Sequence, residues 1–442
     1  MCGLLLAVRP AAGVAFALAL VFVPVALLHL PRGLALWAPI PFVQFLPALW
    51  IGPTVASCFV LGAWMGVDRQ EASIRLRQLG QMSGALVGVG LLLLWFSLSL
   101  IWSDGPLGSS AGLLNWFIAA LVLVIFASVV RAERDVRLIV AAFVGGAVVS
   151  VAIGLIAIGY QPVSSAYESS TFTEGRLQGG SGDPNYLAAG LVPALTLAAG
   201  LAITSRSVLA RIALVAGSAV IATGLAATQS RGGLVAAIVA ATAALLVMRR
   251  HRAQIFASLV VVGAIVAFWF VNNPQAWERV VSSDGGGSGR TELWSLALRM
   301  TQDHPFLGVG FGNFDTEVIH YVREPGQLES VELVLSRSQV VHNAYLQALC
   351  ETGVIGLALL VLVLGTLLRL TYRAGTRFDR RGEQRMATIA RAVFVAQLSG
   401  LTALAFISFG ADQRLWLLFG LGAALYARSG MGAERPPALP AG

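Results

Sequence analysis

Charged residues are scarce in this 442-residue chain, and lysine is absent. Only 12% of the residues are charged and all 30 basic residues are arginine, whereas 57% are hydrophobic and the mean hydropathy is +0.78. A soluble domain of this length needs far more polar surface, so the composition indicates a polytopic membrane protein. The absence of lysine is read as a GC-rich coding bias and carries no functional argument.

Cysteine and histidine are also rare, with three and five residues in the whole chain. Cys2, Cys58 and Cys350 have no metal-ligand spacing, and their separation argues against a disulfide network. The sequence shows no metal-binding constellation, nucleotide-binding loop or Ser/His/Asp arrangement. We therefore expect no cofactor, no metal and no nucleic-acid partner. No cytoplasmic segment is large enough to bind a nucleotide sugar, so a transferred group must arrive activated on a membrane-borne substrate.

Apolar runs recur along the chain, and most are close to the ~20 residues that a helix needs to cross the hydrocarbon core. Backbone groups must be satisfied within the bilayer and no run alternates with period two, so helices are expected rather than barrel strands. The segment 33–66 could cross once, as a broken span, or twice, and parity favours one crossing. The fold class is therefore all-α, with about twelve transmembrane helices. The expected spans are 10–22, 33–66, 82–101, 112–130, 138–158, 185–203, 208–227, 233–248, 253–271, 354–372, 388–408 and 415–427.

Arginine is distributed unevenly between alternate loops, which orients the chain. By the positive-inside rule the arginine-rich loops are cytoplasmic, and 21 of the 30 arginines fall on that side. We expect one transmembrane domain over 1–442, ending in a Pro/Gly/Ala-rich tail at 429–442 that is disordered. The opposite side holds Arg32, Arg176, Arg231, Arg279, Arg290, Arg299, Arg323, Arg337 and Arg414.

Two segments on this opposite side are longer than simple connections, and long ordered loops are usually functional. They are an outside loop at 160–184 and a large, helical loop at 272–353. In the second, a glycine-rich run leads into a helix that starts near Arg290, with Ser288 as its N-cap, and that ends at His304-Pro305. A further helix is expected from Asn343, lying along the membrane interface and bending at Gly353 before the next span.

His342 is the most informative residue of the large loop. Histidine takes up a proton near neutral pH, and the positive end of the helix that begins beside His342 disfavours the imidazolium. A neutral imidazole there could accept a proton. An isolated histidine is more often an interfacial hydrogen-bonding residue, and the neighbouring His304 and His320 have no accompanying pattern.

Three groups of residues are candidate anion ligands. Arg231 precedes two glycines in a tight turn, where its guanidinium could clamp a phosphate or simply contact lipid headgroups. Arg290 follows the glycine-rich run at a helix N-terminus, which is a ready anion site, although flexible loops look the same. Asp183 before Pro184 is a good N-cap, and capping alone would explain it. Nearby Arg176 could add a phosphate or sugar contact.

Four sequence motifs together resemble the O-antigen ligase and polymerase superfamily, the membrane glycosyltransferases with a Wzy_C-type domain. Each motif is degenerate, but their order and the long loop before the last spans are specific together. The resemblance is clearest over about 180–370, and the flanking helices match only in hydropathy. The motifs are Ser230-Arg231-Gly232-Gly233, Gly289-Arg290 with Trp294, 304–314 (His-Pro-Phe-Leu-Gly-Val-Gly-Phe-Gly-Asn-Phe), and 342–347 (His-Asn-Ala-Tyr-Leu-Gln) with Glu351-Thr352-Gly353.

The resemblance implies an enzyme in a bacterial inner membrane whose periplasmic site moves a glycan from an undecaprenyl-pyrophosphate carrier to a hydroxyl acceptor. In the ligase branch, which we favour, the acceptor is the lipid A core; in the polymerase branch it is another lipid-linked repeat, and a related branch uses protein serine or threonine. Essential family residues map onto Arg231, Arg290 and His342. Arg176 is expected to join the pyrophosphate site, with supporting roles for Asp183, Asn185, Ser230 and Asn343.

Physical chemistry agrees with these roles. Departure of a lipid pyrophosphate needs charge stabilisation, which arginines provide without a metal. The acceptor hydroxyl is a weak nucleophile, so His342 would serve as general base, and direct displacement predicts inversion at the anomeric carbon. A polysaccharide or lipid transporter, the rival class, would place charges inside its spans, whereas here they cluster at the ends. A membrane scaffold would not need three outside arginine clusters.

Overall fold

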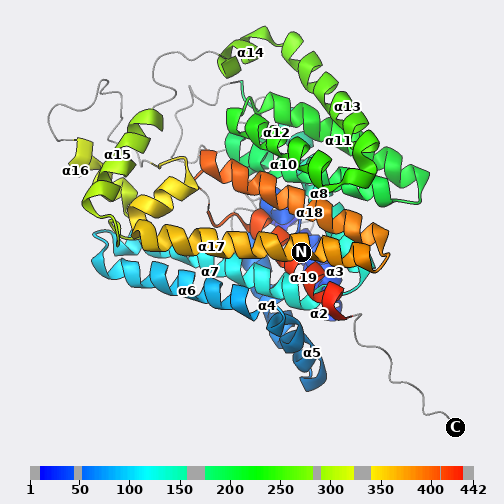
Figure 1. Ribbon diagram of the computed structural model, residues 1–442, viewed down its shortest axis with the longest axis horizontal. Coiled ribbons are helices and arrows are strands. Elements are labelled where there is room, and N and C mark those ends of the chain that lie inside the picture. Colours follow the sequence, from blue (N-terminus) through cyan, green and yellow to red (C-terminus); the bar gives the residue numbers. More distant parts are fainter. Residues whose placement is uncertain are drawn as a thin grey trace.

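The structure, a computed structural model, describes residues 10–43, 52–156, 175–281, 290–322, 340–408 and 410–431. Within these ranges the chain forms helices joined by turns and loops, and no strand is present. The predicted all-α class is confirmed. Figure 1 shows the helices packed into an elongated bundle in which α6, α7 and α17 run side by side.

Eight helices in the described part of the chain are long and apolar enough to cross a membrane, so the protein is multi-pass. The predicted number of twelve is not confirmed. The eight are α6 (Ser83–Ser99, continued by η2, Leu100–Trp102), α7 (Pro106–Val129), α8 (Glu133–Ile156), α10 (Pro184–Thr204), α11 (Val208–Ala227), α13 (Arg252–Val271, preceded by η4, Arg249–His251), α17 (Ala344–Arg380) and α18 (Gln384–Ala403, continued by η6, Leu404–Phe406).

Three further predicted spans form helices outside this group of eight. They are α2 (Pro10–Leu28), α12 (Arg231–Val247), which at 17 residues is short for a crossing, and α19 (Gln413–Met431). Because α19 runs to Met431, the first three residues of the predicted tail at 429–442 are helical, and its remainder lies outside the described residues.

The segment 33–66 is not one continuous helix. It contains the end of α3 (Leu30–Trp37), the turn η1 (Ile40–Phe42) and α4 (Gly52–Met65), and α3 itself follows α2 (Pro10–Leu28) after a single residue. Pro39 and Pro41 lack the backbone N–H that would continue α3, so the helix ends there. The single crossing at 33–66 stays a prediction.

The bundle is built around α10. Its apolar window is 72% buried, compared with 11% for α13 at the edge, and it packs mainly against α18 and α11. Gly200 lets α10 and α18 approach closely, because a Cβ on it would lie 2.5 Å from the Cβ of Ala392. Small residues at helix crossings are typical of membrane bundles. The start of α10 is thereby held at the centre of one end of the bundle.

The same end carries short helices of the large loop: α14 (Pro274–Val281), α15 (Arg290–Asp303) and α16 (Phe314–Val322). In Figure 1, α15 and α16 lie at the left, where α17 begins. The expected bend in α17 is present, because Gly353 adopts φ 68° and ψ −175° within an otherwise helical segment.

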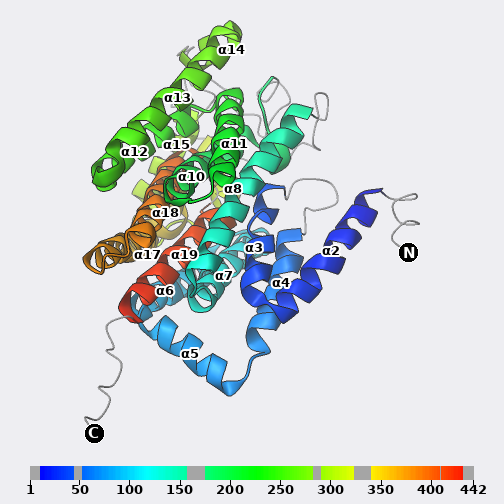
Figure 2. The same cartoon turned by 90° about the vertical axis from the view of Figure 1, so that its right-hand side faces the viewer.

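The opposite end of the bundle holds many of the arginines assigned to the cytoplasm. There Glu71 of α5 (Arg69–Gly80) forms ion pairs with Arg75 at 2.8 Å and with Arg131 at 3.0 Å, and Asp379 pairs with Arg391. Figure 2 shows α5 projecting from the bundle at the side of α19 and the C-terminus, away from α14.

Candidate functional site

Three helix starts at one end of the bundle are fixed by side-chain caps. Asp183 accepts a hydrogen bond from the Tyr186 N–H at 2.6 Å, as its place before a proline predicts. Ser230 accepts one from the Gly233 N–H at 3.1 Å, and Asn343 accepts from two N–H groups of the first turn of α17, both at 3.1 Å. Predicted site residues therefore lie at helix N-termini, where the helix dipole is positive.

Arg176, Asn185 and Ser230 form one hydrogen-bonded cluster. The Oδ1 atom of Asn185 accepts from the Arg176 guanidinium at 3.0 Å and from the Ser230 hydroxyl at 2.9 Å. Arg176 also donates to the Thr228 carbonyl at 2.9 Å, and the backbone pair Leu177–Ala227 fixes this segment against the end of α11. The structure thus joins the predicted residues of the 160–184 loop to the Ser230-Arg231 turn.

Arg231, the first residue of α12, lies on an exposed surface beside this cluster. Its guanidinium donates to the Arg279 carbonyl at 2.8 Å, which ties the end of α14 to the start of α12. The two glycines that follow Arg231 lie against neighbouring helices. Added Cβ atoms would lie 2.5 Å from the Phe406 side chain at Gly232 and 2.7 Å from Ala188 at Gly233, so both glycines are needed for helix packing.

His342 stands directly before the cap of α17, as predicted. Its backbone N–H donates to the Ser408 hydroxyl at 2.7 Å, and no hydrogen bond to its imidazole nitrogens is found in the described part of the chain. The pKa of His342 is lowered to about 4, first because burial disfavours the imidazolium and second because the charge of Arg290 is close; Asp183 opposes the shift. The expected neutral imidazole is supported, and the structure brings His342 near Arg290 and Asp183.

Gln229 and His342 are the two non-glycine residues with positive φ in the described ranges, at 50° and 54°. Each comes directly before an N-cap, Ser230 in one case and Asn343 in the other. A left-handed conformation is unfavourable for a residue with a side chain, and such strain gathers at functional sites. His342 lies in one of the motifs that carry the resemblance, and Gln229 directly precedes another.

α15 holds Arg290 close to His342. Its buried residues Leu293, Leu296, Ala297 and Met300 have the spacing of one helix face and pack with α16 and Val341. The Trp294 indole donates to the Val341 carbonyl at 2.9 Å, one residue before His342. The helix expected from Arg290 to His304 is confirmed, whereas the predicted cap Ser288 lies outside the described residues.

The glycine-rich part of the 304–314 motif, residues 308–314, packs the large loop against the bundle. Gly308, Gly310 and Gly312 all have positive φ. The Gly310 N–H donates to the Glu351 carbonyl at 2.8 Å, and the Gly312 N–H donates to the Glu351 carboxylate at 2.9 Å. Both N–H groups therefore have their acceptors on α17, so this part of the motif has a packing role.

Two polar residues near the start of α19 complete the neighbourhood. Arg414, 1% exposed, pairs with Asp412 at 2.7 Å and donates to the Tyr186 carbonyl at 2.8 Å, with its guanidinium 3.8 Å from the Tyr186 ring centre. Sequence reasoning missed Asp412 and Ser408, and it named Arg414 as an outside arginine that could support the site but belongs to no motif. The sequence signal that could have identified them is the pair of charged residues, Asp412 and Arg414, at the start of an apolar helix.

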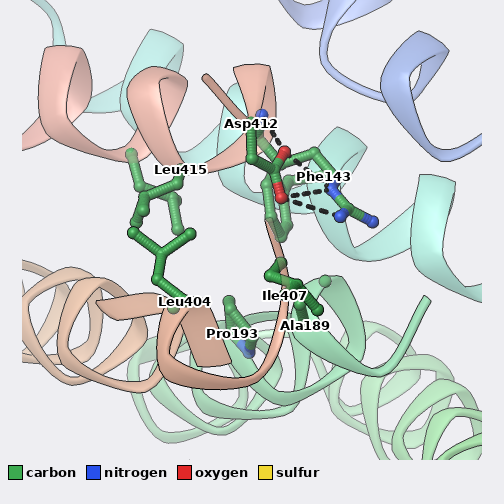
Figure 3. Close-up of a pocket in the computed structure, with 11 residues that line it drawn as sticks. Phe143, Ala189, Pro193, Leu404, Ile407, Asp412 and Leu415 are labelled. Carbon is green, nitrogen blue, oxygen red and sulfur yellow. Dashed lines mark hydrogen bonds and ion pairs between the residues drawn. The ribbon is translucent and has the colours of Figure 1, made fainter. Parts of the chain in front are cut away.

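A small cavity adjoins Asp412 and Arg414. Figure 3 shows Asp412 at this cavity with Ala189 and Pro193 of α10 on another wall. It has about 10 Å³ of space for the centre of a water molecule, which is room for roughly one water and none for a sugar. Among the described residues, no group of three or more His, Cys, Asp or Glu is placed to hold a metal ion.

Comparison with known proteins gives a family match over part of the chain. Residues 216–361 match the family model described as O-antigen ligase, a range that includes Ser230, Arg231, Arg290, His342 and Asn343. The resemblance to the O-antigen ligase superfamily is confirmed, while Arg176, Asp183 and Asn185 lie before the matched range.

A curated relative supports the same superfamily. An O-antigen ligase of Pseudomonas aeruginosa is 28% identical over 288 residues, which cover 61% of this chain and 60% of that protein. The chain therefore spans about 60% of the length of the relative that it matches.

Proposed function

We propose that the protein transfers a glycan from an undecaprenyl-pyrophosphate carrier to a hydroxyl acceptor. The observation that carries the proposal is a neutral imidazole, His342, at a positive helix end and close to the Arg290 guanidinium. Arg176 and Arg231 lie by two further helix starts at the same end of the bundle. This arrangement offers a proton acceptor and anion ligands together.

In the proposed reaction, His342 takes the proton of the acceptor hydroxyl as its oxygen attacks the anomeric carbon. The bond from that carbon to the pyrophosphate oxygen breaks, and undecaprenyl pyrophosphate leaves with the bonding electrons. Arg290, Arg231 and Arg176 offset the charge that develops on the pyrophosphate. A single displacement of this kind inverts the anomeric configuration. The imidazolium then returns its proton to solvent.

Orientation follows from charge. The arginine-rich loops belong on the cytoplasmic side by the positive-inside rule, and they lie at the far end of α17 from His342. We therefore assign the site to the periplasmic face of a bacterial inner membrane. A cysteine placed at the exposed Ser295 should react with a membrane-impermeant maleimide in intact spheroplasts; labelling only after lysis would reverse this orientation.

The ligase branch is our first choice, with the lipid A core as acceptor, and the name of the Pseudomonas aeruginosa relative favours it. An O-antigen or exopolysaccharide polymerase is the second choice. Purified protein in nanodiscs would receive lipid-linked glycan with core lipid A, or with further donor alone. One shift of the core lipid identifies a ligase, and a ladder of lengthening glycans identifies a polymerase. If both mixtures stay unchanged with active donor, the proposed transfer is wrong.

A further inference from the structure

A turn between α15 and the glycine-rich residues 308–314 exposes two large apolar side chains. Phe306 is 67% exposed and Leu307 is 48% exposed, although both belong to a well-ordered turn closed by a hydrogen bond from the Gly308 N–H to the His304 carbonyl at 3.0 Å. Asp303 and His304, just before them, are exposed polar residues. Neither apolar side chain has a part in the proposed chemistry.

Backbone contacts fix the depth of this turn along α17. The Val354 N–H donates to the Pro305 carbonyl at 2.9 Å, and a Cβ on Gly353 would lie 2.1 Å from the Phe306 carbonyl oxygen. The turn therefore rests on the bend of α17, where its apolar, membrane-crossing part begins. Val354 and Ile355, the first residues of that part, are 51% and 38% exposed.

The neighbouring helix α6 marks the same level. The Trp95 indole donates to the Thr352 carbonyl at 3.0 Å, and the Trp95 and Trp102 rings are 5.9 Å apart in an edge-on contact. Tryptophans concentrate at the boundary between hydrocarbon and headgroups. Ile101, at the outer end of α6, is 79% exposed. The outer ends of two spans thus bracket the depth at which the turn lies.

From this register we propose that Phe306 and Leu307 insert into the outer boundary of the lipid bilayer, with lipid acyl chains as their partner. The exposed side chains of the turn lie beside the start of the apolar part of α17, where the exposed Val354 and Ile355 face lipid if α17 crosses the membrane. The insertion anchors the end of α15 to the bilayer. The other end of α15 carries Arg290, so the anchor keeps an anion ligand beside the headgroups, where a lipid-linked substrate resides.

Spin labelling tests the insertion independently of any activity. Full-length protein with Cys2→Ser and Cys58→Ser would carry one nitroxide at Phe306→Cys, Leu307→Cys or, as the control on exposed α15, Ser295→Cys. In nanodiscs, labels at 306 and 307 should collide with oxygen in preference to a nickel chelate, with a ratio several-fold higher than at 295. Because all three side chains are exposed on the protein surface, the fold is expected to survive each substitution.

Two outcomes would overturn the proposal. Nickel accessibility at 306 and 307 equal to that at 295 would place the turn in water. Strong dipolar broadening between labels on separate chains would show that a second copy of the protein, rather than lipid, covers the turn.

Discussion

Ser230 and Asn185 are joined by a hydrogen bond of 2.9 Å although 45 residues separate them in the chain. The bond links the start of α12 to the start of α10, and the same Asn185 oxygen also holds Arg176. One amide therefore sets the position of a candidate donor ligand and of the turn that contains Arg231.

Asn185→Ala should loosen this cluster. It removes the acceptor of the buried Ser230 hydroxyl, and a lost partner of a buried polar group costs about 1–3 kcal/mol. We expect a lower unfolding temperature and weaker binding of lipid-linked donor, measured in detergent and by titration. Asn272→Ala, which removes an exposed amide at the end of α13, is the control. Equal effects of the two substitutions would remove Asn185 from the site.

His342→Ala should reduce glycan transfer by about 10²–10⁴-fold, the usual contribution of a general base. Donor binding should persist, because the arginines remain. The measurements are the initial rate of transfer and the dissociation constant of lipid-linked donor, with His320→Ala as a control at an exposed histidine of the same loop. A near-normal rate for the His342 variant would contradict the assigned base.

Arg290→Gln should raise the pKa of His342 above its value of about 4, because the charge of Arg290 helps to hold it down. Burial, the larger cause, remains, so the pKa should stay below 6.5. Carbon-13 labelling of histidine and NMR titration would measure it, since the chain has five histidines. A titration curve unchanged by the substitution would show that the two residues are not electrostatically coupled.

The lowered pKa of His342 also predicts how stability depends on pH. The unfolded histidine gains its proton as the pH falls through about 6.5, whereas the folded one stays neutral until about 4. The unfolding free energy should therefore fall as the pH drops from about 6.5 to about 4, by at most about 3.5 kcal/mol at 1.4 kcal/mol per pKa unit. His342→Gln should flatten this part of the curve of unfolding temperature against pH; an unaltered slope would assign it to other groups.

Gly308→Ala and Gly353→Ala should each destabilise the fold by at least about 3 kcal/mol, the upper range for a strained backbone. Both residues have positive φ, and the added Cβ would lie 2.3 Å from the Glu351 backbone or 2.1 Å from that of Phe306. Gly365→Ala, later in α17, has no atom within 4 Å of its Cβ and should leave stability unchanged or raised. Thermal unfolding compares the three, and similar values would disprove the packing role.

Local patterns in the sequence predicted the features that depend on neighbouring residues. The cap Asp183, the buried face of α15 and the bend at Gly353 all follow from residues within a few positions of one another. Contacts between distant segments did not follow. The bond from His342 to Ser408 and the pair Asp412–Arg414 against Tyr186 depend on how α10, α17 and α19 pack, which hydropathy alone does not specify.

The glycines show the same limit. The sequence places Gly232 and Gly233 directly after Arg231, but it does not show whether they allow a ligand or a helix to approach, because either role is served by the same residue type. The side chains that decide between them, Phe406 and Ala188, come from other parts of the chain. The order of the four sequence motifs, by contrast, was sufficient to identify the superfamily.

The reversal of backbone hand at Gly353 divides α17 into two rods. The outer rod, 344–352, is fixed by the loop and by α6, and the inner rod runs on to Arg380. The outer rod takes its direction from the loop, whereas the inner rod takes its direction from the spans packed against it. One chain segment therefore belongs both to the loop that carries Arg290 and to the membrane bundle, and it joins the two without a connecting loop.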